Sequence, residues 1–217
     1  MTRKALVFFG GWDGHEPGPS SEIVSGMLEA EGFEVTRREG TAILAEADLS
    51  GFDLIVPVMT MAEVEAEEVK RLTAAVEAGT GLAGFHGGMA DTFRKNTDYQ
   101  FMVGGQFVAH PGNVIDYRVE IAANGDTLLE GIGDFDYHSE QYYMHVDPRI
   151  EVLAETTFSG EHAAWVKDTR MPVVWKHRYG LGRVFYSALG HKSAEFEHPQ
   201  MKEILRRGLL WAARGTA

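Results

Sequence analysis

Short apolar runs alternate with stretches of helical periodicity through the first half of the chain. Residues 4–9, 33–36, 54–58 and 82–85 are rich in apolar and β-branched side chains, as expected of strands buried on both faces. Between them, apolar residues recur every three or four positions, which is typical of amphipathic helices. This alternation predicts βαβ units and a mostly parallel sheet.

The expected helices carry recognisable end signals. The first, with Ile23, Val24, Met27 and Leu28 on one face, ends before Gly32, which suits a C′ position. In the second, Thr60 and Glu63 match a capping box. The apolar stripe that follows comprises Met61, Val64, Val69, Leu72 and Val76, and Gly79 ends that helix.

The second half of the chain is mainly β-like. Residues 179–182, Tyr-Gly-Leu-Gly, predict a hairpin loop, and Pro199 opens a final helix. We therefore expect a single α/β domain over residues 1–217, with extra strands in the second half. The β-like runs are residues 114–121, 142–146, 151–156, 163–167, 173–177 and 183–188.

Charge and hydropathy narrow the range of partners and compartments. Twenty basic and thirty-two acidic residues give a net charge of −12, which repels nucleic acid and anionic membranes. No apolar run is long enough for a signal-peptide core or a membrane span, so we expect a cytoplasmic protein. The sequence leaves a homo-oligomer open.

The chain contains no cysteine, which excludes disulfides, thiolate zinc sites and thiol nucleophiles. Any catalysis must use histidine, carboxylate, hydroxyl or metal chemistry. Residues 79–84 match G-x-G-x-x-G, but they follow a helix and enter a strand, the reverse of a dinucleotide-binding loop. The serine elbow G-x-S-x-G is absent from the sequence, which argues against an α/β-hydrolase.

His86 lies in Gly-Phe-His-Gly-Gly, residues 84–88, directly after a predicted central strand. Small neighbours permit a sharp strand-to-helix turn, and such a turn presents its central side chain at the carboxyl edge of the sheet, where ligands bind. We interpret His86 as a functional residue. The alternative is a histidine whose ring bonds only to nearby backbone groups.

Three further loops carry histidines that this topology would bring to the same edge. His15 and Asp13 follow the first strand, His110 follows Gln106, and His191 follows the last strand. Convergence of several such loops on one pocket is a stronger indication of function than any one of them. The other histidines, which we interpret as structural or surface residues, are His138, His145, His162, His177 and His198.

Residues 137–143 combine tyrosines with Glu140. Aromatic rings beside a carboxylate suit a sugar, and Glu140 would act as a general base if burial raised its pKa towards neutrality. The alternative is a strand on which Glu140 is solvated.

Several segments, in their order and spacing, resemble the ThuA-like (trehalose-utilisation) family of the class I glutamine amidotransferase-like superfamily. The resemblance runs nearly end to end. The segments that carry it are residues 84–88, 104–111, 140–142, 175–186, 190–191 and 210–212.

The resemblance implies a flavodoxin-like three-layer sandwich, with His86 where amidotransferases carry the nucleophilic cysteine. Imidazole cannot replace a thiolate that forms an acyl-enzyme, so glutamine hydrolysis is not expected. The family is associated with utilisation of trehalose and related disaccharides, often beside enzymes that make 3-keto-glycosides. Many members have Asp-Glu-x-Tyr where this chain has Ser139 before Glu140, so a role that needs an acidic pair is in doubt.

Our leading hypothesis is an enzyme that cleaves a keto-glycoside by proton abstraction and C–O cleavage, with Glu140 or His86 as base and His191 or His110 as partner. A non-catalytic sugar-binding or regulatory protein is the main rival. A two-carboxylate glycosidase would need Asp13 or Glu16 opposite Glu140. We expect His86, Glu140 and His191 to be catalytic, and a divalent Zn, Mn or Fe ion to be a possible cofactor. The expected substrate-binding residues are Asp13, His15, Gly87, Gln106, His110 and Tyr142, and the expected metal ligands are His15, His110 and His191.

Overall fold

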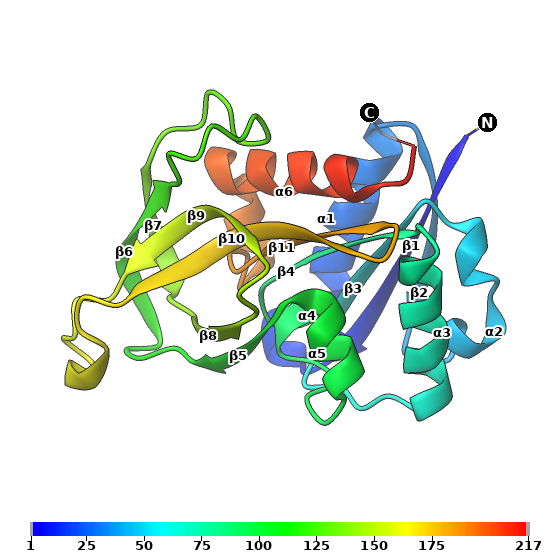
Figure 1. Cartoon of the computed structure of the whole chain (residues 1–217), viewed down its shortest axis with the longest axis horizontal. Helices are drawn as coiled ribbons and strands as arrows, with labels where there is room; N and C mark the ends of the chain where they lie inside the picture. The colour runs from blue at the N-terminus through cyan, green and yellow to red at the C-terminus, as the bar shows by residue number, and fades with distance from the viewer. Residues whose placement is uncertain (1, 216–217) are drawn as a thin grey trace.

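The computed structural model describes residues 2–215. Within these residues a nine-stranded sheet with the order β2-β1-β3-β4-β11-β10-β9-β6-β7 runs through the molecule, and a two-stranded sheet, β5-β8, lies beside it. Figure 1 shows the long sheet with helices packed on both sides. The chain is therefore a mixed α/β protein, as the alternating pattern predicts.

One half of the long sheet is parallel. Its order starts with neighbours β2, β1, β3 and β4, and β11 pairs in parallel with β4. All residues of β3 and β4 are buried, which explains why their sequences are continuous apolar runs. The parallel strands are β2 (Phe33–Glu39), β1 (Arg3–Gly11), β3 (Leu54–Thr60), β4 (Gly81–Phe85) and β11 (Gly182–Ser187).

The other half is antiparallel, and β11 joins the two halves. It pairs with β10 through a tight hairpin in which Tyr179 faces Gly182, so the predicted hairpin is confirmed. The remaining strands of this half extend the sheet away from β11. They are β10 (Arg170–Tyr179), β9 (Glu151–Thr157), β6 (Val114–Ile121) and β7 (Phe135–Glu140), with β5 (Gly105–Ala109) and β8 (Tyr143–Val146) in the small sheet.

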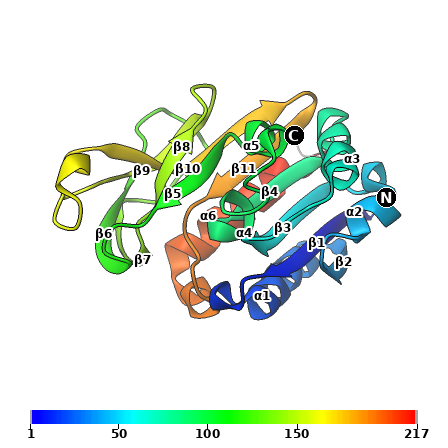
Figure 2. The same cartoon turned by 90° about the horizontal axis from the view of Figure 1, so that it is seen from below.

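Helices form an outer layer on each face of the parallel half (Figure 2). On one face, α1 (Pro17–Ala30) packs on β1 and β2, and α6 (Pro199–Ala212) packs on β4 and β11. The other face carries α3 (Ala66–Glu77), α4 (His86–Ala90) and α5 (Thr97–Val103), with α2 (Ile43–Glu46) against α3. Four short 3₁₀ turns complete the described elements: η1 (Asp13–His15), η2 (Leu49–Gly51), η3 (Ala164–Val166) and η4 (Ser193–Glu197).

The final helix is confirmed, but the predicted start of α3 is wrong. Thr60 continues β3, pairing with Gly11 of β1, so it cannot cap a helix. The capping box is made by Glu65 and Glu68, and α3 begins at Ala66. Met61 and Val64 therefore precede the helix.

Residues 163–167 were expected to be β-like, and this expectation is also wrong. They form the turn η3 inside the loop between β9 and β10. The two ends of this loop bond to each other, since the backbone N–H of Phe158 donates to the carbonyl oxygen of Thr169 and that of Asp168 donates to the carbonyl oxygen of Phe158. Trp165 is 86% exposed, so its ring does not pack on an apolar surface as the side chain of a buried strand would. Sequence analysis also treated residues 105–109, now β5, as loop.

None of the helices within residues 2–215 is both long and apolar enough to cross a bilayer.

Candidate functional site

Five polar side chains meet at the carboxyl edge of the parallel strands. His15 follows β1, His86 follows β4 and His191 follows β11, while Glu140 ends β7 and His110 follows β5. Because β1, β4 and β11 all run in the same direction, their loops emerge at one edge. The predicted convergence of the histidine loops is therefore observed.

His86 stands at the sharp turn from β4 into α4. Its φ of 46° is in the left-handed region, which costs a non-glycine residue conformational energy. The neighbouring glycines are required by contact: a Cβ on Gly84 would lie 2.7 Å from Met89 Sδ, and one on Gly88 would lie 3.1 Å from Val58 Cα. This strained turn places the imidazole at the carboxyl edge of the sheet.

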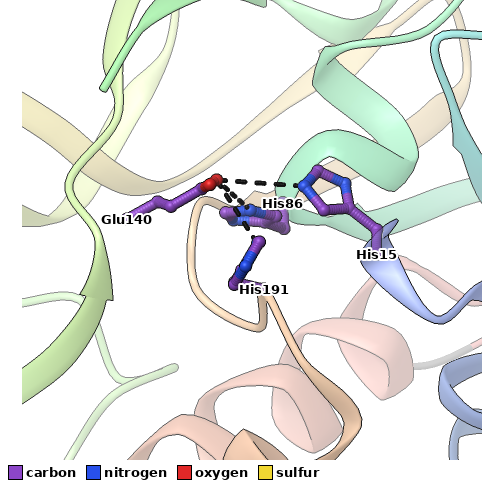
Figure 3. A group of neighbouring side chains, drawn as sticks. All are labelled: His15, His86, Glu140 and His191. Carbon is purple, nitrogen blue, oxygen red and sulfur yellow. Dashed lines mark hydrogen bonds and ion pairs between the residues drawn. The ribbon is translucent and has the colours of Figure 1, made fainter. Parts of the chain in front are cut away.

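Glu140 is the centre of the cluster (Figure 3). Its Oε2 lies 3.1 Å from His86 Nε2, 3.3 Å from His191 Nδ1 and 3.8 Å from His15 Nε2. Its Oε1 lies 3.7 Å from His110 Nε2. One carboxylate thus faces four imidazoles that come from separate loops.

The rings of His86 and His15 are fixed from behind. His86 Nδ1 lies 2.8 Å from the carbonyl oxygen of Ala188, and His15 Nδ1 lies 2.8 Å from Thr60 Oγ1. A carbonyl only accepts, so His86 carries its proton on Nδ1 and, when neutral, turns a lone pair from Nε2 towards Glu140. Tyr142 stacks on His86 with ring centroids 4.1 Å apart.

The pKa of Glu140 differs in direction from the one expected of a general base. Burial alone raises the pKa of its carboxyl, but the imidazoles of His15 and His191 that face it outweigh burial and hold the pKa well below its usual range. Glu140 is therefore ionised, and the expectation of a pKa raised towards neutrality is wrong. Burial lowers the pKa of His86 to about 4, so this ring is neutral near pH 7.

A cavity of about 750 Å³ opens above the cluster. Its volume falls within the roughly 300–1,000 Å³ typical of small-molecule sites. His86, only 1% exposed, lies beneath it. The predicted residues that line the cavity are His15, His110, Glu140, Tyr142 and His191.

Three of the expected substrate-binding residues have other positions. Asp13 lines a separate depression beside Gly10 and Pro17, and Gln106 lines another beside His145. Gly87 lies behind His15: a Cβ there would come 2.6 Å from His15 Cε1. Gly87 therefore makes room for the imidazole, and these three predictions of substrate contact are not supported by the geometry.

Sequence reasoning missed several residues of the cavity wall. Asp91 is buried, pairs with Arg94 and has a pKa raised by burial against the effect of that pair. Its only sequence signal was its place directly after the elbow helix. Trp12, in the glycine-rich loop after β1, is 49% exposed and could stack on a ligand. The other missed residues of the wall are Gly14, Met61, Phe107, Asn113 and Lys192.

Ser139, the residue before Glu140, contacts the carboxylate of Glu195, which comes from a distant part of the sequence. Ser139 Oγ donates to Glu195 at 3.0 Å, and Glu195 Oε2 also accepts from Tyr137 Oη at 2.6 Å and from the backbone N–H of His191 at 3.0 Å. Glu195 lies in η4, far away in sequence. The acidic group that Ser139 lacks is thus brought close by the fold, and it holds the His191 loop.

The donor atoms at the cluster could hold a metal ion. One ligand atom from each of His15, His86, Glu140 and His191 lies within 4.8 Å of every other. This set differs from the expected one, because His86 and Glu140 take the place of His110. His110 faces the other oxygen of Glu140 and is the most exposed of the four rings, at 31% of its side chain.

Comparisons with known proteins agree with the sequence resemblance. The sequence model of the family ThuA, described as trehalose utilisation, matches residues 4–212. No curated protein matches the chain.

Solved structures with the same fold include two ThuA-like proteins. The one from Bacteroides uniformis is 19% identical with a TM-score of 0.77, covering 97% of this chain and 91% of that chain. The one from Parabacteroides merdae is 18% identical with a TM-score of 0.78, covering 100% and 93%. A cytoplasmic protein from Salmonella typhimurium LT2 is 14% identical with a TM-score of 0.68, covering 97% and 99%.

Proposed function

Because this chain belongs to the ThuA family, whose description is trehalose utilisation, we propose that it is an enzyme that cleaves keto-glycosides. Membership of the family indicates a role in carbohydrate utilisation. The reaction and the substrate are our proposal.

The observation that carries the proposal is the convergence of His15, His86, His110 and His191 on Glu140 beneath a cavity of about 750 Å³. Buried polar groups that are costly to assemble and that face an open cavity are typical of catalytic sites. Aromatic side chains around the cavity, among them Trp12 and Tyr142, suit the C–H faces of a sugar.

A ketone at C3 makes the bond cleavage accessible to such groups. A base removes the proton from C2, the C1–C2 double bond forms, and the C1–O bond breaks with its electron pair passing to the glycosidic oxygen. That oxygen takes a proton from an acid. The products are an unsaturated keto-sugar and the released alcohol, and no oxocarbenium ion is needed.

The side chains that line the cavity include one group to remove the C2 proton and one to protonate the leaving oxygen. His110 is the most accessible imidazole of the cluster and faces Glu140 Oε1, so we assign to it the removal of the C2 proton. We assign to Asp91, on the cavity wall, the protonation of the leaving oxygen, because burial raises its pKa against the effect of its pair with Arg94. His86, whose two ring nitrogens face Ala188 and Glu140, orients the carboxylate. His191 and His15 line the cavity, where the oxygens of the sugar would lie.

We assign the fold to the flavodoxin-like, class I amidotransferase-related sandwiches. The order β2-β1-β3-β4-β11 corresponds to the 2-1-3-4-5 order of flavodoxin-like sheets. In this assignment His86 occupies the nucleophile elbow, and a chain without cysteine cannot hydrolyse glutamine through a thioester. By analogy with the Salmonella protein, we place the enzyme in the cytoplasm.

The test is turnover of a 3-keto-disaccharide and of the same disaccharide without the ketone, followed by mass spectrometry. We expect cleavage of the keto-sugar alone and exchange of its C2 hydrogen with solvent deuterium. His110→Ala should lower kcat by about 100-fold or more, since general acid–base catalysis supplies about 10²–10⁴-fold. His138→Ala, an exposed ring paired with Asp116, is the matched control.

Two outcomes would contradict the proposal. Sugar binding without turnover would identify a non-catalytic binding protein. Cleavage of the unmodified disaccharide would favour a two-carboxylate glycosidase, in which Asp91 rather than Asp13 or Glu16 would stand opposite Glu140.

A further inference from the structure

The arrangement around Glu140 leaves lone pairs facing a negative charge. The Nδ1 proton of His86 is directed to a carbonyl oxygen, so its Nε2 meets Glu140 Oε2 at 3.1 Å as a second acceptor. Two acceptors at this distance repel each other unless a cation or a proton lies between them.

His191 supplies an independent sign of a ligand. Its Nδ1 is buried and, among residues 2–215, has no hydrogen-bond partner, although it lies 3.3 Å from Glu140 Oε2. The whole residue is only 8% exposed. A buried nitrogen without a partner destabilises the fold unless something binds it, and this one faces the cluster.

We infer that His15, His86, Glu140 and His191 bind one divalent transition-metal ion that holds the vicinal carbonyl and hydroxyl oxygens of a keto-sugar. The choice of substrate oxygens rests on the proposed function, whereas the metal site does not.

The donor chemistry fits such an ion. Three imidazoles and one carboxylate, without sulfur, suit Zn²⁺, Fe²⁺ or Mn²⁺. Around an ion with bonds of about 2.1 Å, two ligand atoms lie at most about 4.2 Å apart. The cluster's widest separation of 4.8 Å therefore needs a closure of roughly half an ångström, which side-chain rotation can supply.

The outer contacts are those expected around a metal. Ligating histidines bond through their second nitrogen to a carbonyl or another fixed polar group, and His86 and His15 do so through Ala188 and Thr60. The Glu195 carboxylate holds the backbone of His191. The rings of His86 and His15 and the backbone of His191 are thus held by these contacts without an ion.

The site is open on one side only. His15, Glu140 and His191 line the cavity, while His86 is buried beneath them. An ion that takes six ligands, as Mn²⁺ and Fe²⁺ do, would when held by these four residues keep two coordination positions towards the cavity. A ketone and its neighbouring hydroxyl could bind there, and the ion would stabilise the negative charge that develops on the ketone oxygen when the C2 proton leaves.

The test is metal binding by the whole protein. The protein is stripped with a chelator, analysed by elemental mass spectrometry, and titrated calorimetrically with ZnCl₂ and MnCl₂. We expect one ion per chain, with a dissociation constant in the micromolar range or below for at least one metal. His191→Ala should weaken binding by more than about 100-fold, because even outer contacts contribute about 10–100-fold.

A second variant, Thr60→Val, tests the site in case His191→Ala does not fold. It keeps the side-chain shape, removes the contact to His15, and should weaken binding by about 10–100-fold. His138→Ala should bind as the wild type does. Absence of stoichiometric binding, or equal binding by wild type and His191→Ala, would overturn the inference.

Failure of the reaction and failure of the metal site can be told apart. Stoichiometric metal lost in His191→Ala, without turnover of the keto-sugar, supports the site and contradicts the proposed reaction. Turnover that continues unchanged in fully stripped protein contradicts the inferred holding of the sugar oxygens by the metal and supports the reaction.

Discussion

At the scale of single residues, Glu140 shows how strongly the surroundings decide a side chain's chemistry. Sequence reasoning assigned it a raised pKa on the expectation of burial, and burial does act in that direction. Three imidazoles nevertheless surround its Oε2, and the net direction of the pKa shift is reversed. Identifying the residue was possible from its aromatic neighbours, whereas its charge state required knowing which loops approach it.

Gly87 is the residue whose predicted role changes most. A methyl group at this position would meet the ring of His15 at 2.6 Å and Thr60 Cγ2 at 3.1 Å. We predict that Gly87→Ala displaces the His15 ring and lowers kcat/KM by about 100-fold, the cost of roughly 1 Å of misplacement. Steady-state kinetics and thermal unfolding measure the effect. Gly18→Ala, whose Cβ would have open space among the described residues, is the control, and equal activity of both variants would contradict the prediction.

At the scale of elements, α6 packs so closely on the sheet that one of its glycines cannot be replaced. Alanine in a helix is favoured over glycine by about 1 kcal/mol. At Gly208, however, a Cβ would lie 2.1 Å from Cε1 of the fully buried Phe185. Overpacking costs about 1–3 kcal/mol and should outweigh the helix propensity.

We therefore predict that Gly208→Ala lowers the free energy of unfolding by about 1–2 kcal/mol. Gly26→Ala in the middle of α1 is the matched control, because a Cβ there meets nothing within 4 Å among the described residues. It should raise the free energy of unfolding by up to about 1 kcal/mol. Urea denaturation of both variants checks the opposite signs, and stabilisation by Gly208→Ala would show that α6 can move away from β11.

Element ends were the least predictable part of the fold, and α3 shows why. Thr60 with Glu63 and Glu65 with Glu68 both satisfy the distance rule of a capping box. The hydrogen-bonded pairing of Thr60 with β1 decides between them, and that pairing is long-range. The elbow at His86 was predictable because its glycines are required by local contacts.

At the scale of the whole molecule, a buried histidine far from the cavity couples stability to pH. His177 on β10 is 4% exposed and contacts the carbonyl oxygen of Val103, the last residue of α5. Burial lowers the pKa of His177 from its usual 6.5, against the effect of its backbone contacts. The folded protein therefore binds fewer protons at this ring than the unfolded chain does.

The sign of the pH dependence follows from this difference. Above the unfolded pKa of 6.5 the ring is neutral in both states and has no effect; as pH falls below 6.5 the unfolded chain gains the proton first, and stability is lost. We predict that His177→Gln loses less stability between pH 7 and pH 5 than the wild type. Urea denaturation across this range measures it, and parallel pH profiles for the two proteins would contradict it.

The sequence by itself determined the α/β class, the parallel first half, the β-rich second half and the histidine-bearing loops. These features follow from hydrophobic periodicity and from glycines required by local geometry, both of which act over a few residues. The same residues also carried the family resemblance.

Only the tertiary structure decided which of these side chains meet. Glu140, the last residue of β7, meets histidines that follow β1, β4 and β11, while Glu195 approaches Ser139 from η4. The packing of the chain also places Asp91 on the cavity wall. It places Asp13 and Gln106 in two other depressions. Such contacts join residues some fifty to a hundred positions apart, as between His86 and Glu140 (54 positions) or Ala188 (102), so no local pattern encodes them.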